Sequence, residues 1–145
     1  MKNVLILSGS PRKGGNSDLL CSEFMRGAQE SGNEVQKIFV RSKKIAPCSA
    51  CYYCRDHDGK CALNDDMSEI LDAMPAANRE FYFIMTCADD DRAAMACTLE
   101  CFRGFTTCLN GVKEKGVIYG TGVYQPGEVM SSPAMKEAYE MGKNV

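Results

Sequence analysis

The stretch SGSPRKGGNS, from Ser8 to Ser17, has the composition of an anion-binding loop. It follows the apolar run VLIL directly and offers hydroxyls, an amide, glycines and two positive charges, with almost nothing to bury. Backbone N–H groups in such a loop, together with the N-terminus of a following helix, bind phosphate groups. The loop therefore predicts a phosphate-binding site, and a plain flexible connection is the alternative.

The spacing of the glycines excludes two common nucleotide-binding motifs. Gly9 and Gly14 have the spacing of a nucleoside-triphosphate P-loop, but Gly15 and Asn16 stand where that motif needs Lys and then Ser or Thr. The dinucleotide pattern G-x-G-x-x-G is also absent from this loop. Hydroxyl and amide side chains with one Arg suit a phosphate monoester, which keeps its two negative charges.

Four of the nine cysteines lie within fourteen residues, at positions 48, 51, 54 and 61. The odd number of cysteines, without a recognisable leader peptide, argues against a disulfide framework. Overlapping C-x2-C-x2-C spacing is typical of peptides that wrap an iron–sulfur cluster. Structural zinc more often uses two separate C-x2-C pairs, and free thiols are the third alternative. The remaining cysteines are expected to be small buried residues: Cys21, Cys87, Cys97, Cys101 and Cys108.

Two groups of aspartates precede predicted helices. Asp65 and Asp66 come before a short helix through Ile70 and Leu71, and Asp89–Asp91 come before a longer one. We interpret both groups as helix caps rather than as catalytic carboxylate pairs, because Asp is favoured at helix N-termini.

The composition limits the classes of partner. The chain has 145 residues, a net charge of −2, 45% hydrophobic residues and 25% charged residues, which is typical of one globular domain. This charge gives no general attraction for nucleic acid or anionic lipid. No apolar stretch approaches the roughly 20 residues of a membrane span. We therefore expect a cytoplasmic protein without nucleic-acid or membrane partners.

Strands and helices are predicted to alternate along the chain. Strands are expected at 4–7, 34–40, 81–86 and 116–123, and helices after Asn16 or Ser17, at 66–75, at 91–109 and from Pro133 onward. Such alternation indicates a parallel sheet covered by helices on both faces. Ligands bind at the carboxyl ends of such strands, where Ser8–Ser17, Thr86–Asp89 and Gly120–Gly122 are expected to converge.

Three segments resemble the flavodoxin-like NADPH-dependent FMN reductase family. The pattern S-x-S-P-R-x-x-x-N-S and the tail GVIYGTGVYQPGEVMSSPAMKEAYEMGK resemble the family, and PCSACYYCRDHDGKCALNDDM resembles its iron–sulfur flavoprotein branch. The resemblance implies a flavodoxin-like three-layer sandwich, with residues 1–145 as one FMN-binding domain and a cysteine-rich loop at 47–64. It implies FMN contacts at Ser8, Ser10, Pro11, Arg12, Asn16, Ser17, Thr86 and Asp89. It also implies a [4Fe–4S] cluster on Cys48, Cys51, Cys54 and Cys61.

The sequence departs from the family pattern in one place. Family members carry a further strand, ending in P-x-Y, and a helix between the DDM helix and the next strand, whereas here DDMSEILDAMPAANREFYFIMT runs straight on. We expect FYFIMT to move beside the first strand and to give one four-stranded sheet. The phosphate cradle is then kept and part of the flavin ring pocket is lost.

The expected function is that of an FMN-dependent oxidoreductase. The resemblance implies NAD(P)H as reductant and a small molecule or a protein as electron acceptor, with flavin chemistry that needs no side-chain acid or base. A non-catalytic electron carrier or a redox or metal sensor is the alternative. The lost unit should leave apolar surface for a partner chain to cover, so a homo-oligomer, at least a dimer, is expected.

Overall fold

The computed structural model describes residues 1–74 and 79–145 of the chain. Two compact units are formed, Met1–Arg41 with Ala76–Val145, and Ser42–Pro75. The predicted cysteine-rich loop at 47–64 lies inside the second unit. None of the helices in the described residues is long and apolar enough to cross a membrane.

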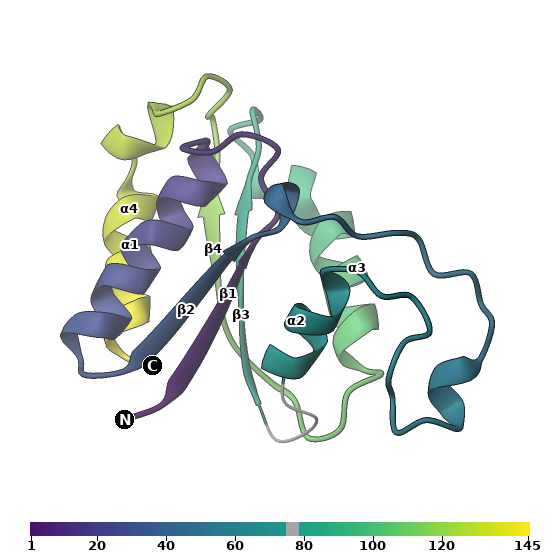
Figure 1. The fold of residues 1–145 in the computed structure, drawn as a ribbon. Helices are drawn as coiled ribbons and strands as arrows, with labels where there is room; N and C mark the ends of the chain where they lie inside the picture. The colour runs from purple at the N-terminus through teal and green to yellow at the C-terminus, as the bar shows by residue number, and fades with distance from the viewer. Residues whose placement is uncertain (75–78) are drawn as a thin grey trace. The chain divides into compact units, whose positions relative to one another are not determined.

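The first unit contains four parallel strands. β1 (Asn3–Ser8) pairs with β2 (Glu34–Phe39) from Asn3↔Glu34 to Ser8↔Phe39, and β3 (Glu80–Thr86) pairs with β4 (Lys113–Gly120) (Figure 1). Each strand is rich in apolar residues, as strands covered on both faces require. The predicted α/β class with four parallel strands is confirmed.

The strands form two ladders rather than one sheet. β1–β2 and β3–β4 are separate two-stranded sheets, and no strand pairing joins β1 to β3 in the described residues. The expectation of a single four-stranded sheet is therefore wrong in this detail. Side-chain contacts lie between the two parts instead. Lys2 Nζ, just before β1, lies 2.8 Å from Glu80 Oε2 in β3, and the Phe24 ring of the helix 16–30 lies 5.3 Å from the Tyr82 ring in β3.

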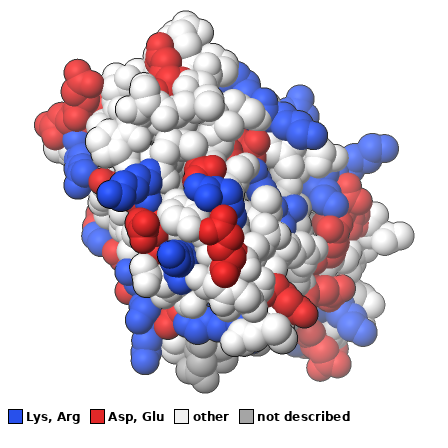
Figure 2. Space-filling view, turned by 90° about the vertical axis from the view of Figure 1, so that its left-hand side faces the viewer, with Lys and Arg blue, Asp and Glu red and all other residues white. Residues whose placement is uncertain are grey.

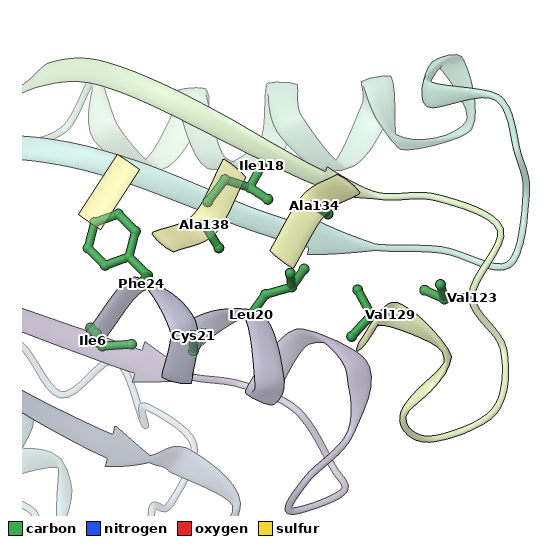
Figure 3. Close-up of a cluster of buried hydrophobic side chains, with 9 residues drawn as sticks. All are labelled: Ile6, Leu20, Cys21, Phe24, Ile118, Val123, Val129, Ala134 and Ala138. Carbon is green, nitrogen blue, oxygen red and sulfur yellow. The ribbon is translucent and has the colours of Figure 1, made fainter. Parts of the chain in front are cut away.

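One core lies between both ladders and two helices, α1 (Asn16–Glu30) and α4 (Pro133–Lys143). The helices approach closely because glycines face them: a Cβ on Gly27 would lie 2.1 Å from the Tyr139 carbonyl oxygen, and one on Gly142 would lie 2.0 Å from that of Phe24. Figure 3 shows the buried side chains of this core, which are Ile6, Leu20, Cys21, Phe24, Ile118, Val123, Val129, Ala134 and Ala138.

A second core covers the other face of β3. Phe83 and Met85 pack with Met95 and Leu99, which come from a 3-10 turn, η3 (Arg92–Met95), and from α3 (Ala96–Thr106). Tyr82 and Ile84 alternate with them and pack against the first core. β3 is therefore covered on both faces, which gives the three layers that the sequence predicts.

Several element boundaries differ from the predictions by one or two residues, and two differ by more. The last strand spans Lys113–Gly120 rather than 116–123, because Gly122 takes a left-handed conformation (φ +65°) and its N–H bonds to the Asp89 carbonyl oxygen at 2.8 Å. The predicted helix at 91–109 begins as η3 and becomes α-helical only at Ala96. Asp91 caps this segment as predicted, accepting the Ala93 N–H at 2.9 Å.

The expectation that the five scattered cysteines are buried is wrong for three of them. Cys21 is buried in the first core, whereas Cys97, Cys101 and Cys108 are exposed. The buried face of α3 is taken by Leu99, so its cysteines fall on the outer face.

The face drawn in Figure 2 carries acidic and basic side chains side by side rather than a patch of one sign. Ion pairs also form along α1, where Arg26 pairs with Glu23 at 2.7 Å and with Glu30 at 3.2 Å.

In the second unit, one aspartate caps α2 (Met67–Ala73) as predicted. Asp65 Oδ1 accepts the Met67 N–H at 3.0 Å, and its Oδ2 accepts that of Ala46 at 2.7 Å. Asp66 does not cap the helix with its side chain but accepts the Lys44 N–H at 2.7 Å. Both carboxylates therefore fasten the segment that leads into the cysteine loop.

Candidate functional site

A pocket of about 530 Å³ lies in the first unit, where the segments after β1, β3 and β4 meet. Its size falls in the range of roughly 300–1,000 Å³ that is usual for small-molecule and cofactor sites. Its place, at the carboxyl ends of parallel strands, is the one that open α/β sheets use for ligands. The lining consists of Ser10, Pro11, Arg12, Asn16, Ser17, Thr86, Cys87, Ala88, Val123, Tyr124 and Gln125.

Most of the predicted cofactor contacts line this pocket, but Ser8 and Asp89 do not. Ser8 is 1% exposed, and its hydroxyl donates to Asp18 Oδ1 at 2.7 Å. Asp89 Oδ1 accepts the Asp91 N–H at 2.8 Å. Both side chains thus bond to neighbouring segments. Direct contact with a cofactor stays a prediction for these two residues and for the predicted residues in the lining.

The loop after β1 is folded tightly on itself. The Ser10 hydroxyl donates to the Arg12 carbonyl oxygen at 2.8 Å, and the Gly15 N–H donates to the same oxygen at 2.9 Å. A Cβ on Gly15 would lie 2.9 Å from Ser10 Oγ, so a larger residue does not fit without a shift. The loop is therefore an ordered cradle rather than a plain flexible connection.

The N-terminus of α1 opens this cradle without a side-chain cap. The sequence predicts Asn16 or Ser17 as the cap, but Gly15 occupies the N-cap position. No side chain accepts a capping hydrogen bond from the first turn of α1. The first N–H groups of a helix lack intrahelical partners and carry partial positive charge. An anionic group in the pocket is their natural acceptor.

Asn16 instead fastens the loop that follows β4. Its Nδ2 donates to the Gln125 carbonyl oxygen at 2.9 Å, and its Oδ1 accepts the N–H groups of Gly127 at 3.0 Å and Val129 at 3.3 Å. Glu128 Oε2 accepts the N–H groups of Tyr124 at 2.6 Å and Gln125 at 2.8 Å. Two loops from opposite ends of the chain are thereby fixed around one pocket.

Cys87 and Ala88 lie in the segment Thr86–Asp89 that was expected at this edge, although neither was named as a contact, and sequence reasoning missed Val123, Tyr124 and Gln125 altogether. The position of these three residues directly after the fourth strand was the available signal. Tyr124 is the most notable of them, because its side chain is 70% exposed beside the pocket and its carbonyl oxygen accepts Arg12 Nη2 at 3.4 Å.

The four clustered cysteines lie in the second unit, and all are exposed. Among the described residues, no three Cys, His, Asp or Glu side chains are gathered closely enough to hold a metal ion. Metal sites are rarely preformed without their ion, so these four residues as cluster ligands stay a prediction.

Backbone N–H groups of the loop nevertheless donate hydrogen bonds to cysteine sulfurs. Cys48 Sγ accepts the Ala50 N–H and Cys61 Sγ accepts the Leu63 N–H, both at 3.4 Å. A hydrogen bond from the Tyr53 backbone to Cys51 lowers the pKa of the Cys51 thiol below its usual value. Hydrogen bonds from backbone N–H groups to sulfur stabilise thiolates and tune clusters that they ligate.

Comparison with known proteins decides the family. Residues 2–85 match the family model for NADPH-dependent FMN reductase. The chain belongs to this family. FMN is the cofactor that membership assigns to it, and its fold class is the flavodoxin-like one that the resemblance implies.

Curated relatives place the chain near the iron–sulfur flavoproteins. It is 43% identical over 72 residues to an iron–sulfur flavoprotein of Methanosarcina thermophila, covering 50% of this chain and 37% of the relative. It is 38% identical over 92 residues to one of Archaeoglobus fulgidus, covering 59% and 41%. The matched part thus spans less than half the length of these relatives.

Solved structures confirm the fold over nearly the whole chain. An NAD(P)H:quinone oxidoreductase from Methanothermobacter marburgensis gives a TM-score of 0.66 at 13% identity, covering 98% of this chain and 94% of the other. An FMN-dependent NADH-azoreductase from Bacillus anthracis, solved in complex with FMN, gives 0.62 at 12% identity, covering 99% of both.

The chemistry of the pocket fits the phosphate end of FMN. The cradle around Gly15 leaves no room for a further side chain, the first turn of α1 has no side-chain cap, and Arg12 lies in the lining. A phosphate monoester satisfies such donors through short charged hydrogen bonds. In this FMN reductase family member, Arg12 and Ser17 are the candidate phosphate ligands that the lining offers, and direct contacts from Ser10 and Asn16, whose side chains are bonded within the protein, stay predictions.

Proposed function

We propose that this chain is an FMN-dependent oxidoreductase that is reduced by NAD(P)H and passes electrons to a small-molecule or protein acceptor. Bound FMN supplies the hydride and electron transfer, and the protein supplies binding, orientation and a shaped site. One observation carries the proposal: an uncapped helix N-terminus, Arg12 and the loops after β3 and β4 line one pocket in a chain of the FMN reductase family.

The residues of the pocket divide into two roles under this proposal. Arg12 and the Ser17 hydroxyl hold the phosphate, Ser10 shapes the loop through its bond to the Arg12 carbonyl oxygen, and Thr86–Ala88 and Val123–Gln125 lie against the rest of the cofactor. Asn16 keeps the two halves of the pocket together through its bonds to residues 125–129. No side chain is assigned as a general acid or base.

We further propose that Cys48, Cys51, Cys54 and Cys61 hold a [4Fe–4S] cluster that exchanges single electrons with FMN. The overlapping spacing, the N–H···S hydrogen bonds and the relatives named iron–sulfur flavoprotein support this proposal. A structural zinc ion or free thiols are the alternatives for the same loop.

A non-catalytic electron carrier or redox sensor is the second candidate function. It is favoured by the separation of the β1–β2 and β3–β4 ladders, because less continuous sheet then supports the flavin end of the pocket. Such a protein would bind FMN without being reduced by NAD(P)H.

Purification without oxygen, followed by an absorbance spectrum and assays of iron and acid-labile sulfide, tests the cofactor content. The proposal predicts flavin bands, a broad brown absorbance, and four iron and four sulfide per chain on the [4Fe–4S] assignment. Flavin bands without iron and sulfide would contradict the cluster and leave a simple flavoprotein, and zinc in the protein would indicate a structural metal site in the cysteine loop. A protein that binds no flavin after incubation with FMN would contradict the proposed function itself.

A further inference from the structure

A largely buried ion pair lies next to the loop Ser8–Ser17, at the edge of a small open hollow that Lys13, Asp18, Lys37 and Phe39 line. Lys37 Nζ of β2 lies 2.7 Å from Asp18 Oδ1 in the first turn of α1, and the two side chains are only 16% and 9% exposed. Neither side chain lines the pocket proposed for FMN. Removing one partner of such a pair leaves an uncompensated charge, so the other contacts of Asp18 and Lys37 indicate which segments depend on the pair.

Asp18 is bonded to both ends of the loop. Its Oδ1 accepts the Ser8 hydroxyl at 2.7 Å, at the last residue of β1, and its Oδ2 accepts the Gly14 N–H at 2.9 Å. Gly14 takes a left-handed conformation (φ +74°) that other residues rarely adopt. One carboxylate therefore fixes the start of the loop and the turn that leads into the helix.

Lys37 is itself held in a single position. Besides the carboxylate, its ammonium donates to the Asp18 carbonyl oxygen at 3.0 Å and to the Ser22 hydroxyl at 2.8 Å. Burial raises the pKa of Asp18, but the bonds from Lys37, Gly14 and Ser8 together outweigh it and keep that pKa below its usual value. The carboxylate is therefore ionised while it braces the loop.

The pair also removes an unfavourable charge interaction with a bound anion. A carboxylate in the first turn of α1 lies close to a site for a phosphate with about two negative charges, and an unpaired charge there would repel the ligand. Lys37 neutralises this charge at 2.7 Å. The braced loop is thereby left with the positive field of Arg12 and of the helix N-terminus.

We propose that Asp18 is a positioning residue for the phosphate of FMN, bracing the loop Ser8–Ser17, and that Lys37 is the charge partner that makes this brace compatible with a bound anion. The inference rests on the proposed function, because it takes the FMN phosphate to lie in this loop. It assigns no contact between either side chain and FMN.

Binding of FMN and of riboflavin, which lacks the phosphate, separates this role from a merely structural one. Removing Lys37 leaves an unpaired carboxylate near the phosphate, so Lys37→Met should weaken FMN by about tenfold or more and riboflavin by less than about twofold. Asp18→Asn should weaken FMN less, and Asp18→Asn/Lys37→Met should bind FMN more tightly than Lys37→Met alone. Lys37→Arg, which keeps the charge, should restore much of the affinity.

Lys2→Met is the matched control, because it removes an exposed Lys–Glu80 pair in the same unit, and it should leave both affinities unchanged. Equal losses for FMN and riboflavin in Lys37→Met, or no loss for either, would overturn the inference. Where Lys37→Met fails to fold, Asp18→Asn carries the same comparison of FMN with riboflavin.

Arg12→Ala in the same titration separates this inference from the proposed function. If Arg12→Ala weakens FMN selectively while Lys37→Met and Asp18→Asn do not, the brace is wrong and the phosphate site stands. If the unmodified protein binds FMN and riboflavin equally and Arg12→Ala changes neither, the phosphate site is wrong and the inference falls with it.

Discussion

At the scale of single residues, Arg12 is the cation that lines the pocket beside the α1 N-terminus. Arg12→Ala removes a charged hydrogen bond worth about 1.5–3 kcal/mol. We therefore expect the dissociation constant of FMN to rise by about one to two decades, measured by fluorescence titration. Unchanged affinity would refute the assignment of the phosphate to this loop.

The clustered cysteines give a second test at this scale. If one [4Fe–4S] cluster uses all four thiolates, Cys51→Ser and Cys61→Ser should each abolish the brown absorbance and the acid-labile sulfide of anaerobic preparations. Cys97→Ser is the control, because Cys97 is equally exposed but lies outside the cluster loop. Loss of the chromophore in the control as well, or its retention in the two ligand variants, would contradict the ligand set.

Residue types and local order in the sequence predict the anion cradle, because hydroxyls, amides and Arg12 are all local to one loop. They do not predict the long-range hydrogen bonds that hold this loop in place. Asn16 bonds to residues 109 to 113 positions further along the chain, and Lys37 reaches back 19 residues to Asp18. Hydrogen bonds over such separations depend on the packing of elements, which local patterns do not encode.

At the scale of elements, the contact of α1 with α4 depends on glycine. A Cβ on Gly142 would lie 2.0 Å from the Phe24 carbonyl oxygen, so Gly142→Ala should lower the free energy of unfolding by about 1–3 kcal/mol. Gly104 in α3 has nothing within 4 Å of its Cβ position, so Gly104→Ala should raise it by about 0.5–1 kcal/mol. Denaturant unfolding measures both, and equal shifts in the two variants would contradict the close contact.

Element types follow from the sequence better than element ends do. Apolar runs predict β1 and β3 most clearly, because strands of a covered parallel sheet bury both faces. The end of β4 depends on the left-handed Gly122 and its bond to Asp89, a contact between two loops. The absence of β1–β3 pairing in the described residues is likewise a property of how the two ladders are arranged, which no single segment specifies.

At the scale of the whole molecule, the first unit exposes large apolar side chains. Leu7 is 40% exposed, Phe102 42% and Phe105 50%, and a partner chain that covered such side chains would remove apolar surface from water. We expect the FMN-loaded protein to be at least a dimer at micromolar concentration, as measured by multi-angle light scattering. A stable FMN-bound monomer under these conditions would contradict the expectation.

Anaerobic mixing of the FMN-loaded protein with NADPH or NADH, followed by flavin absorbance, tests the central claim most directly. An oxidoreductase with FMN in the pocket formed by the loops after β1, β3 and β4 should show loss of the flavin bands on adding about one equivalent of nicotinamide nucleotide, because one hydride reduces one flavin. Arg12→Ala at the same total FMN should bleach less, in proportion to its lower occupancy. Bound flavin that stays oxidised with both nucleotides would contradict the proposed reductase and leave the electron carrier.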